Sequence, residues 1–216
     1  MSQVTAGRAL HLWSLHEDVV VEPGPNADEL VLHSRRFGPE RIDRPDPLVR
    51  EALRRMELGP VLLTNVTARS PDGARYEGHG TRLVLPTVLN RLSHLIVRTL
   101  SWDDLRGPLL SVASVRRVGA FVPVAVSARR LIRLMSGVRL TLAEAGFTLD
   151  LVGAAYQVHL HRPEAVWVVG LLAWPVTPSD MTSALPLPPD VTRAVLSYLV
   201  AAGMTEDCGP RRAAHG

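Results

Sequence analysis

The chain has 216 residues, which is enough for two domains of about 100 residues each. Hydrophobic residues make up 46% and charged residues 21%, a composition typical of globular proteins that excludes a disordered chain. The net charge is +3, and all 24 of the Lys+Arg residues are Arg. A Schiff-base lysine, a P-loop lysine and a lysine general base are therefore excluded.

The cysteine count and the lack of long apolar runs indicate the cellular compartment of the protein. Cys208 is the single cysteine, so no disulfide can form within the chain. No apolar run approaches the roughly 18 residues that span a bilayer, and the start of the chain lacks the pattern of a signal peptide. These features predict a cytoplasmic protein.

The first half is predicted to contain strands followed by helices. LHLWSLHEDVVVEP and ELVLHSRRF, separated by the turn residues GPNAD, predict a β-hairpin with a third short strand near Arg41–Ile42. A helix should begin at Asp46, whose side chain can cap it, and end at Gly59–Pro60. The polar run 69–80 predicts a loop, LPTVLNRLSHL a second helix and IVRTLSW a strand.

The second half is predicted to follow a similar order. LLSVASVRRV predicts a strand and FVPVAVSARR an extended connector. The alternating runs RLIRLMSGVRLTLAEAG and FTLDLVGAAYQVHLHRP predict strands, with Gly153 at a turn or bulge. PEAVWVVGLLAW predicts a helix, TPSDMTSAL a short helix starting near Thr177 or Ser179, and LPPDVTRAVLSYLVAAGM a third helix ending at Gly203.

This order of strands and three helices suggests an internal repeat. GPVLLTNV at 59–66 aligns with WPVTPSDM at 174–181, and LSHLIVRTL at 92–100 with LSYLVAAGM at 196–204. We therefore predict an α+β fold of two tandem winged-helix-turn-helix-like domains, each a small antiparallel sheet with three helices. The predicted ranges are 1–104 for the first domain, 105–130 for a connector, 131–207 for the second domain and 208–216 for a disordered tail.

The sequence contains no recognisable catalytic constellation. His159 and His161 would face the same side of a strand, but no cysteine or carboxylate lies at ligand spacing, so we expect no metal site. Neither a nucleophile elbow nor a glycine-rich phosphate loop is present. We therefore expect no catalytic residues and favour a binding module over an enzyme.

A winged helix can bind DNA or a peptide. The predicted third helix of the second domain carries one arginine, and the arginine pairs of the chain are scattered, so DNA binding is the weaker alternative. A peptide can instead add as a strand to the edge of the sheet, with its side chains resting on the third helix. The predicted peptide-binding residues are Tyr156, Gln157, Val158 and His159 on a strand and Arg193, Ser197 and Tyr198 on the helix.

Several segments resemble a known family. LHLWSLHEDVVVEP, ELVLHSRRFG, DPLVREALRRMELGPVLLTNV and LHRPEAVWVVGLLAWPVTPSDM resemble the N-terminal portion of actinobacterial SagB-type azoline dehydrogenases, and the second half resembles a PqqD-like peptide-recognition unit. The resemblance implies a role in the biosynthesis of ribosomally made, modified peptides such as thiopeptides. Members of the family continue into a flavin domain with a Lys-Tyr catalytic pair, which this lysine-free chain does not contain.

We therefore expect a non-catalytic subunit that recognises the leader of a precursor peptide or acts as a scaffold. Its partner would be a separate flavin dehydrogenase or cyclodehydratase, with FMN on that partner and no cofactor in this chain. Two alternatives stay open: a subunit of an FMN-dependent azoline dehydrogenase that contributes to the oxidation, and a winged-helix DNA-binding regulator. We expect no membrane partner, and homo- or hetero-oligomers are both compatible with the sequence.

Overall fold

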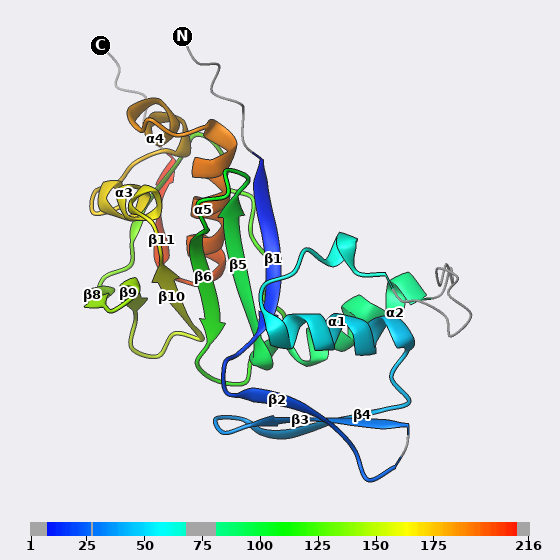
Figure 1. The fold of residues 1–216 in the computed structure, drawn as a ribbon. Helices are drawn as coiled ribbons and strands as arrows, with labels where there is room; N and C mark the ends of the chain where they lie inside the picture. Colours follow the sequence, from blue (N-terminus) through cyan, green and yellow to red (C-terminus); the bar gives the residue numbers. More distant parts are fainter. Residues whose placement is uncertain (1–7, 27, 68–80, 211–216) are drawn as a thin grey trace, which may run out of the picture. The chain divides into compact units, whose positions relative to one another are not determined.

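The structure is a computed structural model that describes residues 8–26, 28–67 and 81–210 (Figure 1). The described residues form a mixed α+β fold with five α-helices, which confirms the predicted fold class. The chain divides into two compact units. We call residues 11–99 and 113–121 the N-terminal unit, and residues 1–10, 100–112 and 122–216 the C-terminal unit.

The N-terminal unit contains the predicted hairpin and third strand. The first apolar run splits into two strands, because a turn at residues 16–18 interrupts it. The Asp18 carboxylate accepts hydrogen bonds from Ser34 Oγ at 2.8 Å and Arg36 N at 3.2 Å, which holds this turn beside the end of the hairpin. The strands are β1 (Ala9–Leu15), β2 (Val19–Pro23), β3 (Glu29–Ser34) and β4 (Gly38–Asp43).

Helix α1 (Pro47–Leu58) has the predicted bounds. Asp46 Oδ1 accepts a hydrogen bond from Leu48 N at 2.8 Å, and Gly59 follows the last turn. Helix α2 (Thr81–Arg91) begins four residues before the predicted segment, with Pro86 inside it. A 3₁₀ turn at Ser93–Leu95 then leads into β5 (Ile96–Trp102). The predicted loop at 69–80 lies outside the described residues.

The C-terminal unit contains the predicted second set of strands and helices. Thr177 caps α4 through a hydrogen bond from Asp180 N to its Oγ1 at 3.1 Å, as the sequence predicted. The strands are β6 (Pro108–Ser114), β7 (Arg130–Leu134), β8 (Arg139–Ala143), β9 (Gly146–Asp150), β10 (Tyr156–Leu160) and β11 (Thr205–Pro210). The helices are α3 (Pro163–Leu171), α4 (Pro178–Ala184) and α5 (Pro189–Ala201).

Three sheets account for the strands. Their orders are β1-β5-β6-β10-β9-β8, β11-β7 and β2-β3-β4. Strand β6 lies inside the range predicted as a connector, and β11 extends three residues into the range predicted as a tail. Residues 211–216 of that predicted tail lie outside the described residues.

The predicted pair of winged-helix domains is not confirmed. The two stretches that suggested a repeat differ in local structure: Ser93–Leu95 is a 3₁₀ turn followed by strand β5, whereas residues 196–201 continue helix α5. Helical and extended segments can share an apolar pattern over a few residues, so a short match of letters did not establish equivalent structure.

Each unit has its own apolar core. In the N-terminal unit α1 packs against α2 and β2, and the side chains of Leu32, Leu53 and Leu89 are fully buried. In the C-terminal unit α5 contacts α3, α4 and β11. Its fully buried side chains include Leu149, Leu160, Leu172, Leu196, Tyr198 and Leu199.

Replacing the cap of α1 should destabilise the N-terminal unit. We expect Asp46→Ala to lower the free energy of unfolding by about 1 kcal/mol, because the N–H of Leu48 loses its acceptor. Urea denaturation followed by circular dichroism measures the change. Asp43→Ala, an exposed aspartate at the end of β4, is the matched control, and an equal loss in both variants would contradict the capping role.

Candidate functional site

The four predicted peptide-binding residues on a strand lie on β10, which is an interior strand. Its neighbours are β6 and β9, and His161 N, just after β10, donates a hydrogen bond to Leu109 O at 2.9 Å. Val158 is fully buried, while Tyr156, Gln157 and His159 are half-buried. A peptide could add to β10 only if β6 or β9 first left it.

The three predicted helix residues lie on α5 in different environments. Arg193 is exposed, Ser197 is half-buried and Tyr198 is fully buried in the core. The carbonyl of Ser197 accepts a hydrogen bond from Val124 N at 3.4 Å, so the chain at Val124 contacts helix α5 at this point. The predicted role of these residues in peptide binding stays a prediction.

Two histidines at the end of β10 contact residues of the neighbouring strands β6 and β9. His161 Nε2 is 2.8 Å from Ser111 Oγ, and His159 Nδ1 is 3.3 Å from Thr148 Oγ1. The two imidazole rings stack with their centroids 6.5 Å apart. Burial lowers the pKa of His161, and the neighbouring His159 lowers it further. Both side chains are thus engaged in cross-strand contacts, and the described residues contain no group of three or more His, Cys, Asp or Glu side chains that could hold a metal ion.

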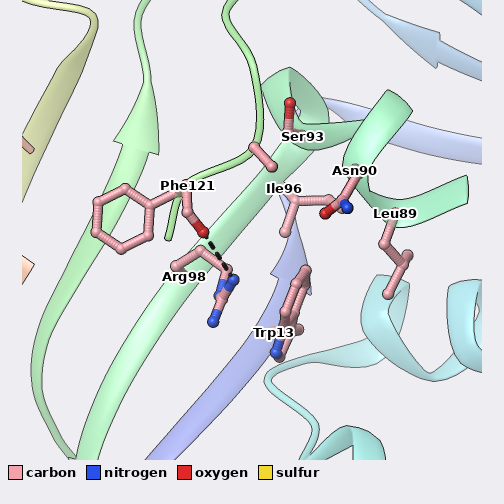
Figure 2. Close-up of a pocket in the computed structure, with 8 residues that line it drawn as sticks. Trp13, Leu89, Asn90, Ser93, Ile96, Arg98 and Phe121 are labelled. Carbon is pink, nitrogen blue, oxygen red and sulfur yellow. Dashed lines mark hydrogen bonds between the residues drawn. The ribbon is translucent and has the colours of Figure 1, made fainter. Parts of the chain in front are cut away.

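A small recess lies in the N-terminal unit (Figure 2). The guanidinium of Arg98 stacks over the ring of Trp13 at 3.5 Å from its centroid and donates a hydrogen bond to the carbonyl of Phe121 at 3.1 Å. Asn90 and Ser93 also line the recess, whose volume is about 10 Å³. This volume holds roughly one water molecule, so the recess does not enclose a substrate or a cofactor.

An ion-pair network holds the start of α3 in the C-terminal unit. Both terminal nitrogens of Arg162 are 2.9 Å from the carboxylate of Asp104, and Arg162 Nη2 is 2.6 Å from Glu164 Oε1. Arg162 and Glu164 are buried, and the hydrogen bond from Arg162 lowers the pKa of Glu164. The network joins the connection between β5 and β6 to the first turn of α3.

The strand edges of the N-terminal unit are covered or interrupted. Trp13 and Val61 exchange two backbone hydrogen bonds of 2.9 and 2.8 Å along β1. On β2, Glu57 Oε1 accepts a hydrogen bond from Val21 N at 2.9 Å. On β4, Arg91 Nη2 donates to the carbonyl of Arg41 at 2.8 Å. Each of these contacts satisfies a backbone group that a further strand would need.

The β7–β11 sheet of the C-terminal unit is protected in similar ways. Ile132 on β7 exchanges two backbone hydrogen bonds of 3.0 Å with Val176. The register of β11 shifts between Asp207 and Gly209, and its acidic side chains pair with arginines of β7. Bulges and charged side chains are devices that keep edge strands from pairing with other chains.

Strand β8 is the one edge strand for which the described residues show no such protection. It is the last strand in its sheet, and its register with β9 is uninterrupted from Arg139–Asp150 to Ala143–Gly146. All five residues of β8 are exposed on a strand without proline, and Leu140 and Leu142 are 45% and 73% exposed. Within the part of the chain that the structure describes, β8 has no strand on its outer side.

The register also determines which backbone groups of β8 point outward. Only two residues separate Ala143 from Gly146 at the turn between β8 and β9. Ala143 and Gly146 therefore form a hydrogen-bonded pair. Hydrogen-bonded and non-hydrogen-bonded pairs alternate along an antiparallel ladder. The N–H and C=O groups of Leu140 and Leu142 therefore point away from β9, toward the open edge.

The open edge of β8 was not predicted from the sequence. The alternation of RLTLA predicted a strand, but the alternation also made Leu140 and Leu142 resemble core residues. Strand order in a sheet is set by pairings between distant segments, which the pattern of one strand does not encode. The nearest signal in the sequence was Gly146, a turn residue between two alternating runs, which does not indicate the outer neighbour of the strand.

The sequence matches no protein-family model, and no curated protein matches it. No helix among the described residues is both long enough and apolar enough to cross a membrane.

Removing the central arginine of the ion-pair network should destabilise the protein strongly. We expect Arg162→Met to lower the free energy of unfolding by about 3–5 kcal/mol, because two buried or half-buried carboxylates lose their partner. Arg106→Met is the matched control. Arg106 Nη1 is 3.4 Å from Glu164 Oε1, but the Arg106 side chain is 65% exposed, so this ion pair should contribute less than about 1 kcal/mol. Urea denaturation of both variants tests this difference, and equal losses would contradict it.

Stability should fall as the pH drops below about 6.5. The pKa of His161 is lowered in the folded state, so the unfolded state binds the proton more readily, and each unit of pH below that value costs at most about 1.4 kcal/mol. We expect His161→Gln to reduce the slope of unfolding free energy against pH between pH 7.5 and 5, as measured by urea denaturation. His33→Gln, an exposed histidine, is the control, and an unchanged slope in His161→Gln would refute the assignment.

Proposed function

We propose that this chain is a non-catalytic subunit that binds the precursor peptide of a ribosomally made, modified natural product as an added strand along β8. A separate flavin dehydrogenase or cyclodehydratase would carry out the chemistry, with FMN on that partner. The observation that supports the proposal is the uncovered edge of β8, which offers the backbone groups of Leu140 and Leu142 to another strand. Main-chain hydrogen bonds of this kind give affinity for an extended peptide.

The contrast with the other edges supports a binding role for β8. The edges of β1, β2, β4 and β7 carry a backbone or side-chain hydrogen bond, and β11 carries a bulge and ion pairs. An open apolar edge strand promotes unwanted pairing, so proteins normally block it. A strand that must accept a peptide has to keep its edge open.

The resemblance to SagB-type dehydrogenases and PqqD-like units suggests the class of peptide. In the C-terminal unit, strands β7 to β10 are followed by three helices and then by β11, an order compatible with the winged-helix-like unit expected from that resemblance. Binding the leader would raise the effective concentration of the substrate at the partner enzyme. The peptide site predicted on β10 and α5 would require β6 or β9 to move, whereas the edge of β8 requires no rearrangement.

A labelled leader peptide tests the proposal. We expect a synthetic, fluorescein-labelled leader of the precursor encoded beside this gene to bind the full chain, measured by fluorescence anisotropy. Leu142→Pro should weaken this binding about tenfold or more, because it removes an outward N–H without breaking a hydrogen bond to β9. Leu142→Val keeps that N–H and is the matched control.

Four results would contradict the proposal. The first is a leader that does not bind at tens of micromolar protein, and the second is equal binding by the Leu142→Pro and Leu142→Val variants. The third is a yellow chromophore that copurifies with the chain, which would favour a flavin-binding subunit. The fourth is salt-dependent retardation of the chain's own promoter DNA, which would favour a regulator.

A further inference from the structure

Two rows of apolar side chains cross β10, β9 and β8 on one face of the sheet. Their members on β10 and β9 are buried or half-buried, whereas Leu140 and Leu142 on β8 are 45% and 73% exposed. The rows therefore begin in the core of the C-terminal unit and end in solvent at the open edge. From β10 to β8 they are Val158–Leu149–Leu140 and Leu160–Phe147–Leu142.

The two exposed leucines also carry the outward-facing backbone groups. Side chains and backbone hydrogen-bonding groups both alternate in direction along a strand, with a period of two residues. The side chains of Leu140 and Leu142 therefore lie on the same face, and their backbone groups point to the same edge. A strand added to β8 would thus pair with their backbone and place alternate side chains beside them. Apolar side chains at those positions would extend both rows and cover the leucines.

The opposite face of β8 is polar and carries a positive charge. Arg139 and Thr141 lie there, and Arg139 is the only charged residue of β8. Asp150 lies opposite Arg139 on β9, but its carboxylate accepts a hydrogen bond from Gln157 Nε2 at 2.5 Å. Among the described residues Arg139 forms no ion pair, so an incoming carboxylate on this face would meet an exposed guanidinium.

We infer that β8 selects an extended segment in which apolar residues alternate with acidic ones. The apolar residues would face the side of Leu140 and Leu142, and an acidic residue would face Arg139. This inference rests on the proposed function and adds to it the chemical class of the peptide. It specifies a pattern, two apolar residues at i and i+2 with a carboxylate on the other face, rather than a particular sequence.

A second copy of the chain fits this edge less well than an acidic peptide. Symmetric antiparallel pairing that places Leu140 against Leu142 would bring each Arg139 opposite an Ala143, which offers no opposite charge. A contact through a strand of five residues also falls well short of the roughly 800 Å² per partner that stable dimers bury. Charge and size therefore both favour a short acidic peptide.

Designed probe peptides test the pattern without knowledge of the natural precursor. We would titrate the full chain into fluorescein-labelled Gly-Ser-Leu-Glu-Leu-Glu-Leu-Ser-Gly and into the same peptide with lysine in place of glutamate. The glutamate probe should bind about two- to fivefold more tightly, as expected for an exposed ion pair. Arg139→Glu should reverse the preference. Arg129→Glu, an exposed arginine outside the strands, has the same charge change and should leave the preference unaltered.

The outcomes separate this inference from the proposed function. If the natural leader binds but neither probe does, or if Arg139→Glu does not change the preference, the inferred pattern is wrong while the peptide-binding role stands. If neither the leader nor the probes bind, both fail. A concentration-dependent dimer in sedimentation velocity that Leu142→Arg abolishes would assign the edge to a second copy and would also overturn the inference.

Discussion

Every strand of this protein is constrained by the need to hydrogen-bond its backbone N–H and C=O groups. In the interior of the sheets neighbouring strands meet this need, as β6 and β9 do for β10. At the edges the chain uses short local solutions, such as the Glu57 carboxylate on Val21 N and the backbone bridge between Trp13 and Val61. Strand β8 stands out because each of the other edge strands carries at least one such contact, or a bulge with ion pairs.

The same constraint explains which predictions from the sequence succeeded. Helix α1 was predicted with its cap at Asp46 and its end at Gly59, because capping and termination are local chemistry. The β2–β3 hairpin was predicted for the same reason. Strand order is not local: the sequence placed the open edge on β10, whereas pairing with β6 from fifty residues earlier makes β10 an interior strand.

Burial was also harder to predict than secondary structure. Tryptophan is a large apolar residue that is highly buried on average, yet Trp167 and Trp174 are 44% and 70% exposed. Helix α3 is apolar on all sides, so its pattern does not distinguish the buried face from the exposed one. Arg162 is the opposite case. Arginine usually lies at the surface, yet Arg162 is buried between the carboxylates of Asp104 and Glu164.

The division of the chain into units has a practical meaning for anyone who handles the protein. The backbone passes between the N-terminal and C-terminal units four times, after residues 10, 99, 112 and 121. No single cut can release either unit as one continuous piece, and three of the four passages fall within the strands β1, β5 and β6. Truncation would therefore remove parts of strands, so substitutions in the intact chain are the appropriate way to dissect it.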